Sequence, residues 1–477
     1  MKVLLVLKEG LFFERLGVMC LSSALKERGY QVKLTYATNR DIRTLVKSFA
    51  PQIIGFSAMS GEFEFLRHTN EKLKKEFSFI SVFGGAHATF SPEIISDPAI
   101  DAICIGEGDI AFPEFCSRIE KNGPYWETEN FHVKYLGEIH RNPLGLLVDD
   151  LDSLPLPDRG IMYSVDAELR DSRHKLFMSS RGCPYKCSYC FNDKYNEIYK
   201  GKGDIVRSKT PEGFISEIVQ IMDSYPLDYV YIADDTFTLK PNGWIQRFVE
   251  LYLEFVKLPM LVNFRASSLK EEDVRELARA GLDSAYVGVE CGDEEISNTI
   301  LRRNTSNKKI IDACRILSHY RIKFITFNLL ALPVEHPFEI DLKTLDLNIQ
   351  LRPTFAYTSL VFPFSGTALH SYSKSKGYLP ADYSILNTSR RSSVFNYNDP
   401  KEKMMVENLQ KVFAVTVNFP FLRSYVVSLC KMPFPSLFNA FNFLYQGYVY
   451  KFKIWPWKDW KEVFRYFSFF IRTIKKT

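Results

Sequence analysis

The strongest constraint on the fold is an alternation between short apolar segments and amphipathic helical segments, which occurs twice along the 477-residue chain. In the first run, which ends near residue 120, helical segments such as Val18–Arg28 separate the apolar ones, and Gly29 follows at a position where helices commonly end. This alternation predicts a doubly wound domain with a parallel sheet. Its strands are predicted at Val3–Leu7, Val32–Tyr36, Ile53–Ser57, Ile80–Phe83 and Ala102–Ile105.

The second run begins near residue 175 and has longer helical segments, among them Glu212–Ser224, Gly243–Lys257 and Glu271–Ala280. Six strand–helix units in succession predict a partial (β/α)6 barrel, whose reactive face lies at the carboxyl ends of the strands. The six strands are predicted at Leu176–Ser180, Tyr229–Ala233, Leu261–Arg265, Ala285–Glu290, Phe324–Ala331 and Ala356–Phe362.

The rest of the chain separates and follows these two runs. Residues 121–175 read as irregular and rich in Pro, Asp and Gly, as in Leu154-Pro-Leu-Pro-Asp-Arg159, which indicates a linker. Beyond about Tyr378 the sequence becomes aromatic-rich and helical. The predicted organisation is therefore a doubly wound domain at 1–130, a linker at 131–170, the partial barrel at 171–378 and a helical carboxyl-terminal domain at 379–477.

Composition limits the classes of function. The net charge of +5 is small for this length and gives no reason to invoke nucleic acid. The apolar run Val3–Leu7 is too short for a secretory signal, so we expect a cytoplasmic protein. Nine cysteines, an odd number, do not suggest a disulfide framework. Six of them read as buried thiols: Cys20, Cys104, Cys116, Cys291, Cys314 and Cys430.

The other three cysteines, Cys183, Cys187 and Cys190, fall within eight residues directly after a predicted strand. Three thiolates in a CxxxCxxC loop can hold three irons of a 4Fe–4S cubane and leave the fourth iron open to a substrate or cofactor. The alternative is a structural zinc site, but such sites use four closed ligands, and no nearby His or Cys completes one here.

This loop resembles the signature of the radical S-adenosylmethionine enzymes, including the aromatic Tyr189 before the last cysteine. The resemblance implies that the backbone of Tyr189 contacts the adenine of S-adenosylmethionine. Asp234 and Asp235, after the second barrel strand, look like the family's segment for the amino group of the cofactor. Val287-Gly-Val-Glu-Cys-Gly292 resembles its GVESG segment, in which Glu290 would contact polar groups of the cofactor. Helix capping is the alternative reading of these acidic residues.

Three departures or weaker matches accompany the resemblance. Cys291 stands where serine is usual. Leu330-Ala-Leu-Pro-Val-Glu335 lacks both glycines of the family's GLPGE pattern, whereas Pro363-Phe-Ser-Gly-Thr-Ala-Leu369 fits its P-x-x-G-T-x-L segment. The last two segments are equally consistent with ordinary strand-to-helix turns.

Glycines follow two strands of the first run, at Gly84, Gly85 and Gly106, where a ligand can approach the backbone. Tight turns are the alternative. With Ser57, Ser60 and Glu107, these residues resemble the cobalamin-binding domain that precedes many radical S-adenosylmethionine enzymes, and the resemblance implies that they border the corrinoid. The segment from residue 9 to 17 lacks the histidine that ligates cobalt in other cobalamin domains, and His87 reads as pocket lining or a turn residue. A domain that binds nothing remains an alternative.

The resemblance implies cleavage of S-adenosylmethionine to a 5′-deoxyadenosyl radical, most simply for cobalamin-dependent methylation of an unactivated carbon. An electron donor such as flavodoxin or ferredoxin is implied. A cobalamin-dependent cyclase or rearrangement enzyme would share every motif. A tRNA methylthiotransferase would need a second cysteine cluster, and a non-catalytic redox sensor would not need the strand-end motifs.

The carboxyl-terminal residues 431–477 carry nine Lys or Arg against two acidic residues, with Trp455, Trp457 and Trp460 between them. Basic charge mixed with large aromatic side chains suits an anionic membrane surface, which suggests peripheral membrane contact and a small-molecule or lipid-like substrate. A terminal helix packed on the barrel is the alternative. Met432–Tyr450 has nineteen uncharged residues but is broken by Pro433, Pro435 and Gly447, so a membrane span is not expected.

Overall fold

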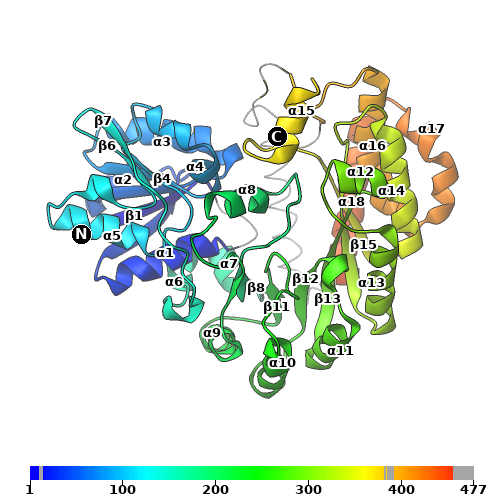
Figure 1. The fold of residues 1–477 in the computed structure, drawn as a ribbon, viewed down its shortest axis with the longest axis horizontal. Coiled ribbons are helices and arrows are strands. Elements are labelled where there is room, and N and C mark those ends of the chain that lie inside the picture. The colour runs from blue at the N-terminus through cyan, green and yellow to red at the C-terminus, as the bar shows by residue number, and fades with distance from the viewer. Residues whose placement is uncertain (10–13, 381–382, 384–391, 455–477) are drawn as a thin grey trace. The chain divides into compact units, whose positions relative to one another are not determined.

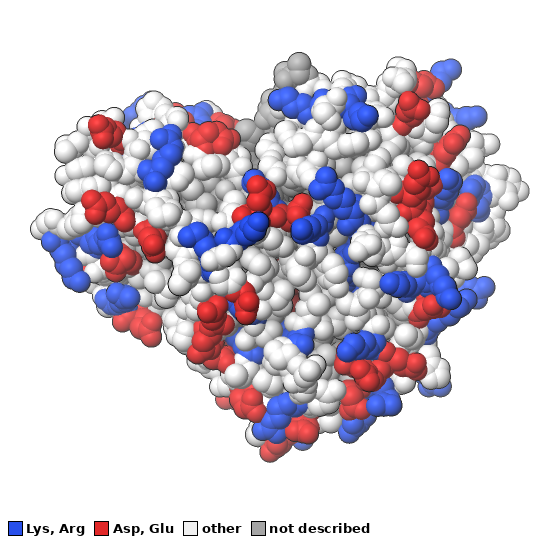
Figure 2. All heavy atoms as spheres, viewed as in Figure 1, with Lys and Arg blue, Asp and Glu red and all other residues white. Residues whose placement is uncertain are grey.

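The computed structural model describes residues 1–9, 14–380, 383 and 392–454, and the chain divides into two compact units (Figure 1). The first unit consists of Met1–Pro184 and Phe191–Asp228, and the second of Tyr185–Cys190 and Tyr229–Thr477. In the view of Figure 2, basic and acidic side chains are interspersed over the surface.

The first unit is built on a seven-stranded sheet with the order β2-β1-β3-β4-β5-β6-β7. Its first five strands are parallel, and helices lie on both faces (Figure 1). The strands are β1 (Lys2–Leu7), β2 (Gln31–Tyr36), β3 (Ile53–Ser57), β4 (Ile80–Gly84) and β5 (Ala102–Cys104), and the helices are α1 (Leu16–Glu27), α2 (Ile42–Phe49), α3 (Phe63–Lys74), α4 (Ala86–Phe90) and α5 (Ala111–Glu120).

The continuous apolar run of β1 explains why this sheet is covered on both faces. Val3, Leu5 and Leu7 belong to one buried cluster, and Leu4 and Val6 belong to another. Successive side chains of a strand point to opposite faces, so a run without polar residues needs helices on each side.

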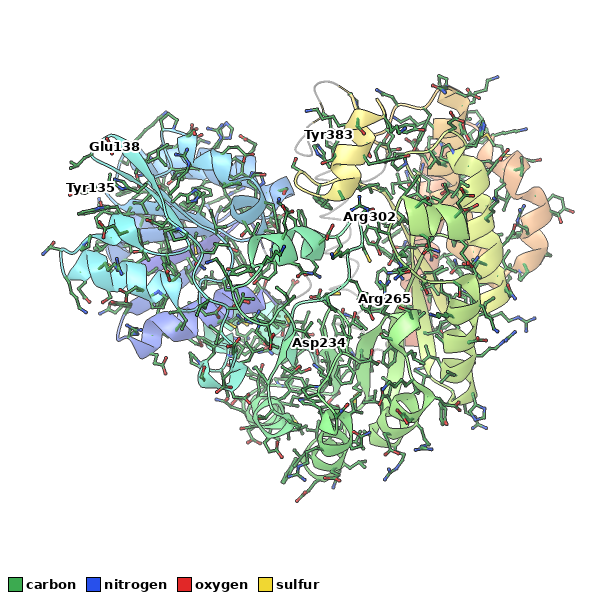
Figure 3. The ribbon with its side chains drawn as sticks, viewed as in Figure 1. Tyr135, Glu138, Asp234, Arg265, Arg302 and Tyr383 are labelled. Atoms are coloured by element: carbon green, nitrogen blue, oxygen red, sulfur yellow. The ribbon has the colours of Figure 1, made fainter. Side chains whose placement is uncertain are left out.

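The region read as irregular from sequence contains a hairpin that we did not predict. Strands β6 (Phe131–Tyr135) and β7 (Glu138–Arg141) are antiparallel, and β6 pairs antiparallel with β5, which extends the sheet. The turn residues Leu136 and Gly137 have φ of 49° and 86°, the positive values of a two-residue hairpin turn. Figure 3 labels Tyr135 and Glu138, which flank this turn.

The remaining elements of the first unit surround the cysteine loop in sequence. They are α6 (Arg159–Tyr163), α7 (Ala167–Asp171), β8 (His174–Phe177), β9 (Ser180–Arg181), α8 (Phe191–Ile198), β10 (Arg207–Ser208) and α9 (Pro211–Ser224). Asp158 begins α6 by accepting from the Ile161 N–H, and its carboxylate also pairs with Lys26 of α1 at 2.6 Å. Strands β9 and β10 form a two-stranded antiparallel sheet.

The second unit contains five strands that pair in parallel in the order β15-β14-β13-β12-β11. Together with β8 they are the six strands predicted for the βα array, and the predicted fold class is confirmed. The strands are β11 (Tyr229–Ile232), β12 (Met260–Phe264), β13 (Leu282–Glu290), β14 (Lys323–Leu330) and β15 (Phe355–Leu360). The intervening helices are α10 (Trp244–Phe255), α11 (Glu271–Ala280), α12 (Glu294–Thr299), α13 (Asn307–His319) and α14 (Pro337–Leu351).

Helices complete the second unit after β15. Helix α16 (Pro400–Asn418) packs against β15 and α14 through buried Val406, Leu409 and Phe413. Within the described residues no helix is long and apolar enough to cross a membrane. Trp455, Trp457 and Trp460 lie outside those residues. The elements are α15 (Ala368–Ser375), α16 (Pro400–Asn418), the short 3-10 turn η7 (Pro420–Tyr425), α17 (Val426–Cys430), α18 (Pro435–Val449) and the π-helical turn η8 (Tyr450–Ile454).

Candidate functional site

The second half of the cysteine loop, residues 185–190, is fixed to the second unit through Ser188. The Ser188 N–H donates to the Leu301 carbonyl at 3.0 Å, and its hydroxyl donates to the Ile300 carbonyl at 2.6 Å. The N–H of Leu369 donates to the Ser188 carbonyl at 2.8 Å. The P-x-x-G-T-x-L segment, which from sequence was equally consistent with a turn, therefore supports the backbone of the cysteine loop.

The start of the loop requires glycine before the first cysteine. Gly182 has a φ of 88°, and a Cβ there would lie 1.9 Å from the Ile205 carbonyl oxygen. The following Cys183 is buried, and its carbonyl accepts from the Asn196 side chain at 2.9 Å. Close packing of the backbone thus fixes the position of Cys183, the first cysteine of the loop.

The three cysteines are divided between the two units: Cys183 belongs to the first, and Cys187 and Cys190 belong to the second. In the part of the chain that is described, no group of three or more His, Cys, Asp or Glu side chains is arranged as a metal centre. None of the nine cysteines, all of which are described, forms a disulfide. Ligation of a cluster by these three residues therefore stays a prediction.

Arg265 provides a cationic partner for the loop that sequence reasoning missed. It follows β12 directly (Figure 3), and its Nη1 donates to the Cys187 Sγ at 3.3 Å. The guanidinium lies 3.8 Å from the centre of the Tyr185 ring, and its Nε donates to the Ser267 hydroxyl at 2.9 Å. Hydrogen bonds to cysteine sulfurs are one of the features by which proteins set the potential of an iron–sulfur cluster, so this contact fits a thiolate ligand.

Glu290 and Tyr189, both predicted site residues, meet at a second arginine. Arg303 Nη1 donates to the Tyr189 hydroxyl at 3.1 Å and lies 3.6 Å from Glu290 Oε1. Burial raises the pKa of the Glu290 carboxyl, and the Arg303 guanidinium opposes that rise. Glu290 has a φ of 65° at the irregular carboxyl end of β13. A buried carboxylate held beside an arginine is a suitable group to orient polar parts of a ligand.

Asp234 and Asp235 differ in their surroundings. The Asp234 side chain is fully buried and pairs with the Lys240 ammonium at 2.6 Å, and its carbonyl accepts from Asn263 at 2.8 Å. Asp235 is exposed. Asp234 lies just beyond the carboxyl end of β11, as Arg265 does for β12 (Figure 3). Contact of Asp234 and Asp235 with the amino group of the cofactor stays a prediction.

Cys291, whose role the family pattern left open, is a core residue of the second unit. It is fully buried among apolar side chains, and its thiol lies 3.6 Å from the Asp293 carbonyl. Burial raises the pKa of Cys291 to about 12. It therefore behaves as a small hydrophobic side chain.

Ala331 occupies the position of the first missing glycine. Its φ is 60°, and the Asp341 carboxylate accepts its N–H at 3.0 Å while the Tyr397 hydroxyl donates to its carbonyl at 2.8 Å. These hydrogen bonds hold a left-handed conformation that glycine adopts at lower cost.

A pocket of about 340 Å³ opens at the carboxyl end of the first sheet. Its apolar interior includes Leu5, Phe56 and Phe112, and its rim includes five of the six residues predicted to border a corrinoid: Ser57, Gly84, Gly85, Gly106 and Glu107. Ser60 is not among the lining residues. Its hydroxyl lies 3.2 Å from His87 Nδ1, and His87 belongs to the short helix α4 and is not among the lining residues either.

Glu107 is held by a network at this rim. Arg207 donates to both oxygens of its carboxylate at 2.7 and 3.1 Å, and the Tyr195 hydroxyl donates at 3.1 Å. Arg181, two residues before Cys183, makes a bidentate pair with Asp109 at 2.8 and 3.0 Å. The start of the cysteine loop is thus tied to the loop after β5, within one unit.

Gly106, one of the residues that line the pocket, has no room for a side chain. Its φ is 74°, and a Cβ there would lie 1.9 Å from the hydroxyl of the fully buried Tyr199. The same hydroxyl accepts the Glu107 N–H at 2.9 Å. A pocket of this size with an apolar interior and a glycine rim fits part of a large planar cofactor.

Comparison with known proteins agrees with this geometry. Residues 3–116 match the B12 binding domain, and residues 177–342 match the Radical SAM superfamily. The chain belongs to the radical S-adenosylmethionine enzymes that carry a cobalamin-binding domain. The cofactors of this class are a 4Fe–4S cluster, S-adenosylmethionine and cobalamin, as the sequence predicted.

Individual relatives are distant. The chain is 24% identical over 369 residues to an uncharacterised methyltransferase of Pyrococcus horikoshii, covering 75% of this chain and 78% of that protein. It is 25% identical to an anaerobic magnesium-protoporphyrin IX monomethyl ester cyclase of Rubrivivax gelatinosus, covering 62% of this chain and 55% of the relative. The solved structure of the cobalamin-dependent radical enzyme OxsB, with aqua-cobalamin and S-adenosylmethionine bound, superposes with a TM-score of 0.68 at 18% identity. That match covers 99% of this chain and 75% of the other and shows a shared fold.

Proposed function

We propose that this chain is a cobalamin-dependent methyltransferase that methylates an unactivated carbon of a small-molecule or lipid-like substrate. The observation that carries the proposal is the pairing, in one chain, of a cysteine loop beside cationic Arg265 with a glycine-rimmed pocket on the B12-type sheet. The methyltransferase of P. horikoshii supports transfer of a methyl group as the reaction.

Cys183, Cys187 and Cys190 would hold the cluster, with one iron open to S-adenosylmethionine. When bound, the reduced cluster supplies the electron that cleaves the cofactor. The residues of this chain would bind and orient: Arg265 donates to the Cys187 sulfur, and Arg303 holds Glu290 and Tyr189, which would contact S-adenosylmethionine. The electron would come from a small redox protein such as flavodoxin or ferredoxin.

Ser57, Gly84, Gly85 and Gly106 would border cobalamin in the first unit. No histidine is among the described residues that line this pocket, which supports cobalt without a histidine ligand from the protein. Electron paramagnetic resonance of the Co(II) form after anaerobic reconstitution tests this. We expect no nitrogen hyperfine splitting from a lower ligand. Splitting of that kind would overturn this part of the proposal.

A cyclase or rearrangement enzyme is the second candidate, favoured by the likeness to the R. gelatinosus cyclase. The two reactions differ in what becomes of S-adenosylmethionine. A methylase forms 5′-deoxyadenosine and S-adenosylhomocysteine in near-equal amounts, whereas a cyclase forms no matching S-adenosylhomocysteine.

The experiment is anaerobic turnover with methyl-deuterated S-adenosylmethionine and an extract fraction that contains the substrate, followed by mass spectrometry. We expect a deuterated methyl group in the product. Consumption of substrate without label in any product would exclude methyl transfer and leave the cyclase reaction.

A further inference from the structure

Helix α18 carries a row of large apolar side chains on its exposed side. Phe434, just before the helix, and Phe452, just after it, continue the row, and each of the six side chains is between 49% and 66% exposed. Positions three and four apart lie on one face of a helix, so the row forms a single stripe. We call it the α18 apolar face: Phe434, Leu437, Phe441, Leu444, Tyr448 and Phe452.

The opposite side of α18 already has a partner. Phe438 and Val449 are buried, and the helix packs against α16. The core of the second unit therefore does not need the α18 apolar face. Large apolar side chains exposed together in this way mark an interaction surface.

The charged residues of the chain segment that carries this face are all basic. Residues 408–458 contain no Asp or Glu, although the chain as a whole has 56 acidic residues. Lys431 and Lys453 are exposed, and Lys451 lies 4.8 Å from the centre of the Phe452 ring. An apolar stripe whose own segment carries only basic charge is complementary to a lipid bilayer, which has an apolar interior and can have an anionic surface.

We propose that the α18 apolar face docks onto the surface of an anionic lipid bilayer, with the helix lying in the plane of the interface. A helix with one apolar side and basic flanks binds in this manner, and no described helix is long and apolar enough to span. The basic residues around the face would repel a second copy of it. Residues 455–477 contain six basic and two acidic residues, so the basic residues around the α18 apolar face would repel them as well. The same positive charge would strengthen the attraction of the chain to anionic lipid. The proposal does not depend on the reaction assigned above.

The test is flotation of the full chain with vesicles of phosphatidylcholine alone or mixed with phosphatidylserine. We expect binding to the mixed vesicles that weakens in high salt, because part of the attraction is electrostatic. The variant Leu437→Glu/Leu444→Glu should bind at least about tenfold more weakly, because it loses the favourable free energy of transferring two leucine side chains from water into the bilayer.

The matched control is Leu136→Glu/Leu146→Glu, which makes the same changes at two leucines of the first unit that are 86% and 80% exposed. It should bind vesicles as the wild type does, and both variants should keep the wild-type melting temperature. Equal binding by the two variants would overturn the proposal. So would absence of vesicle binding by the wild type, and in that case a dimer that the α18 variant converts to monomer would assign the face to a second copy. A lowered melting temperature of the α18 variant alone would instead assign it to contact within the chain.

Discussion

Replacing Gly106 with alanine should distort the pocket that we propose for the corrinoid more than an ordinary left-handed glycine substitution would. At a φ of 74°, alanine pays roughly 1–2 kcal/mol for the left-handed backbone alone. The new Cβ would also lie 1.9 Å from the Tyr199 hydroxyl and 2.7 Å from its Cζ, so the buried ring must move. Overpacking of this kind costs about 1–3 kcal/mol, which gives a total loss of about 2–5 kcal/mol in the free energy of unfolding.

Gly137 offers a control in the same unit. Its φ is 86°, but a Cβ there would meet nothing within 4 Å, so Gly137→Ala should lose only the roughly 1–2 kcal/mol of backbone strain. Denaturant unfolding measures both losses. The combination Gly106→Ala/Tyr199→Phe should cost less than the sum of its parts, because the phenylalanine lacks the clashing oxygen.

Binding of hydroxocobalamin provides the functional readout, and Gly106→Ala should weaken it while Gly137→Ala should not. If Gly106→Ala is no more destabilising than Gly137→Ala and binds cobalamin normally, the close packing of Gly106 on Tyr199 is not what shapes the rim.

Two further predictions concern single side chains. Burial lowers the pKa of His87 to about 4, below its ordinary value of 6.5, so its contribution to stability is complete above pH 6.5 and is lost as the pH falls toward 4. The variant His87→Asn should therefore show a weaker dependence of the melting temperature on pH between 6.5 and 4. An unchanged dependence would argue against a buried neutral imidazole. Lys240→Met should lower the free energy of unfolding by about 3–5 kcal/mol, because the buried Asp234 carboxylate loses the ammonium group with which it pairs. Adding Asp234→Asn should recover much of that loss in denaturant unfolding. If it recovers none, the ion pair is not the cause.

The sequence predicted the features that depend on local pattern. The alternation of apolar and amphipathic segments predicted the doubly wound sheet, and the glycines at 84, 85 and 106 were expected at strand ends, where the pocket now lies. The hairpin from Phe131 to Arg141 was missed because its strands are short and only partly apolar, and because its turn begins with Leu136, which has a positive φ without being glycine.

Side-chain partners that are distant in sequence were not predictable. Arg265 and Arg303 lie 78 and 114 residues from the loop residues to which they donate, and arginine is common on protein surfaces. The one available signal was position, because Arg265 directly follows a barrel strand. Asp234 shows the converse, since its place in a motif suggested a ligand contact while the fold pairs its carboxylate with Lys240.

The most direct test of the account is the metal content of one protein sample reconstituted anaerobically with iron, sulfide and hydroxocobalamin. The wild type should hold roughly four irons together with one corrinoid per chain. The variant with Cys183, Cys187 and Cys190 all replaced by alanine should lose the iron and its visible absorbance but keep the corrinoid, because none of the three cysteines lines the pocket. Retention of about four irons by that variant, or a wild type that binds no corrinoid, would contradict the central claim.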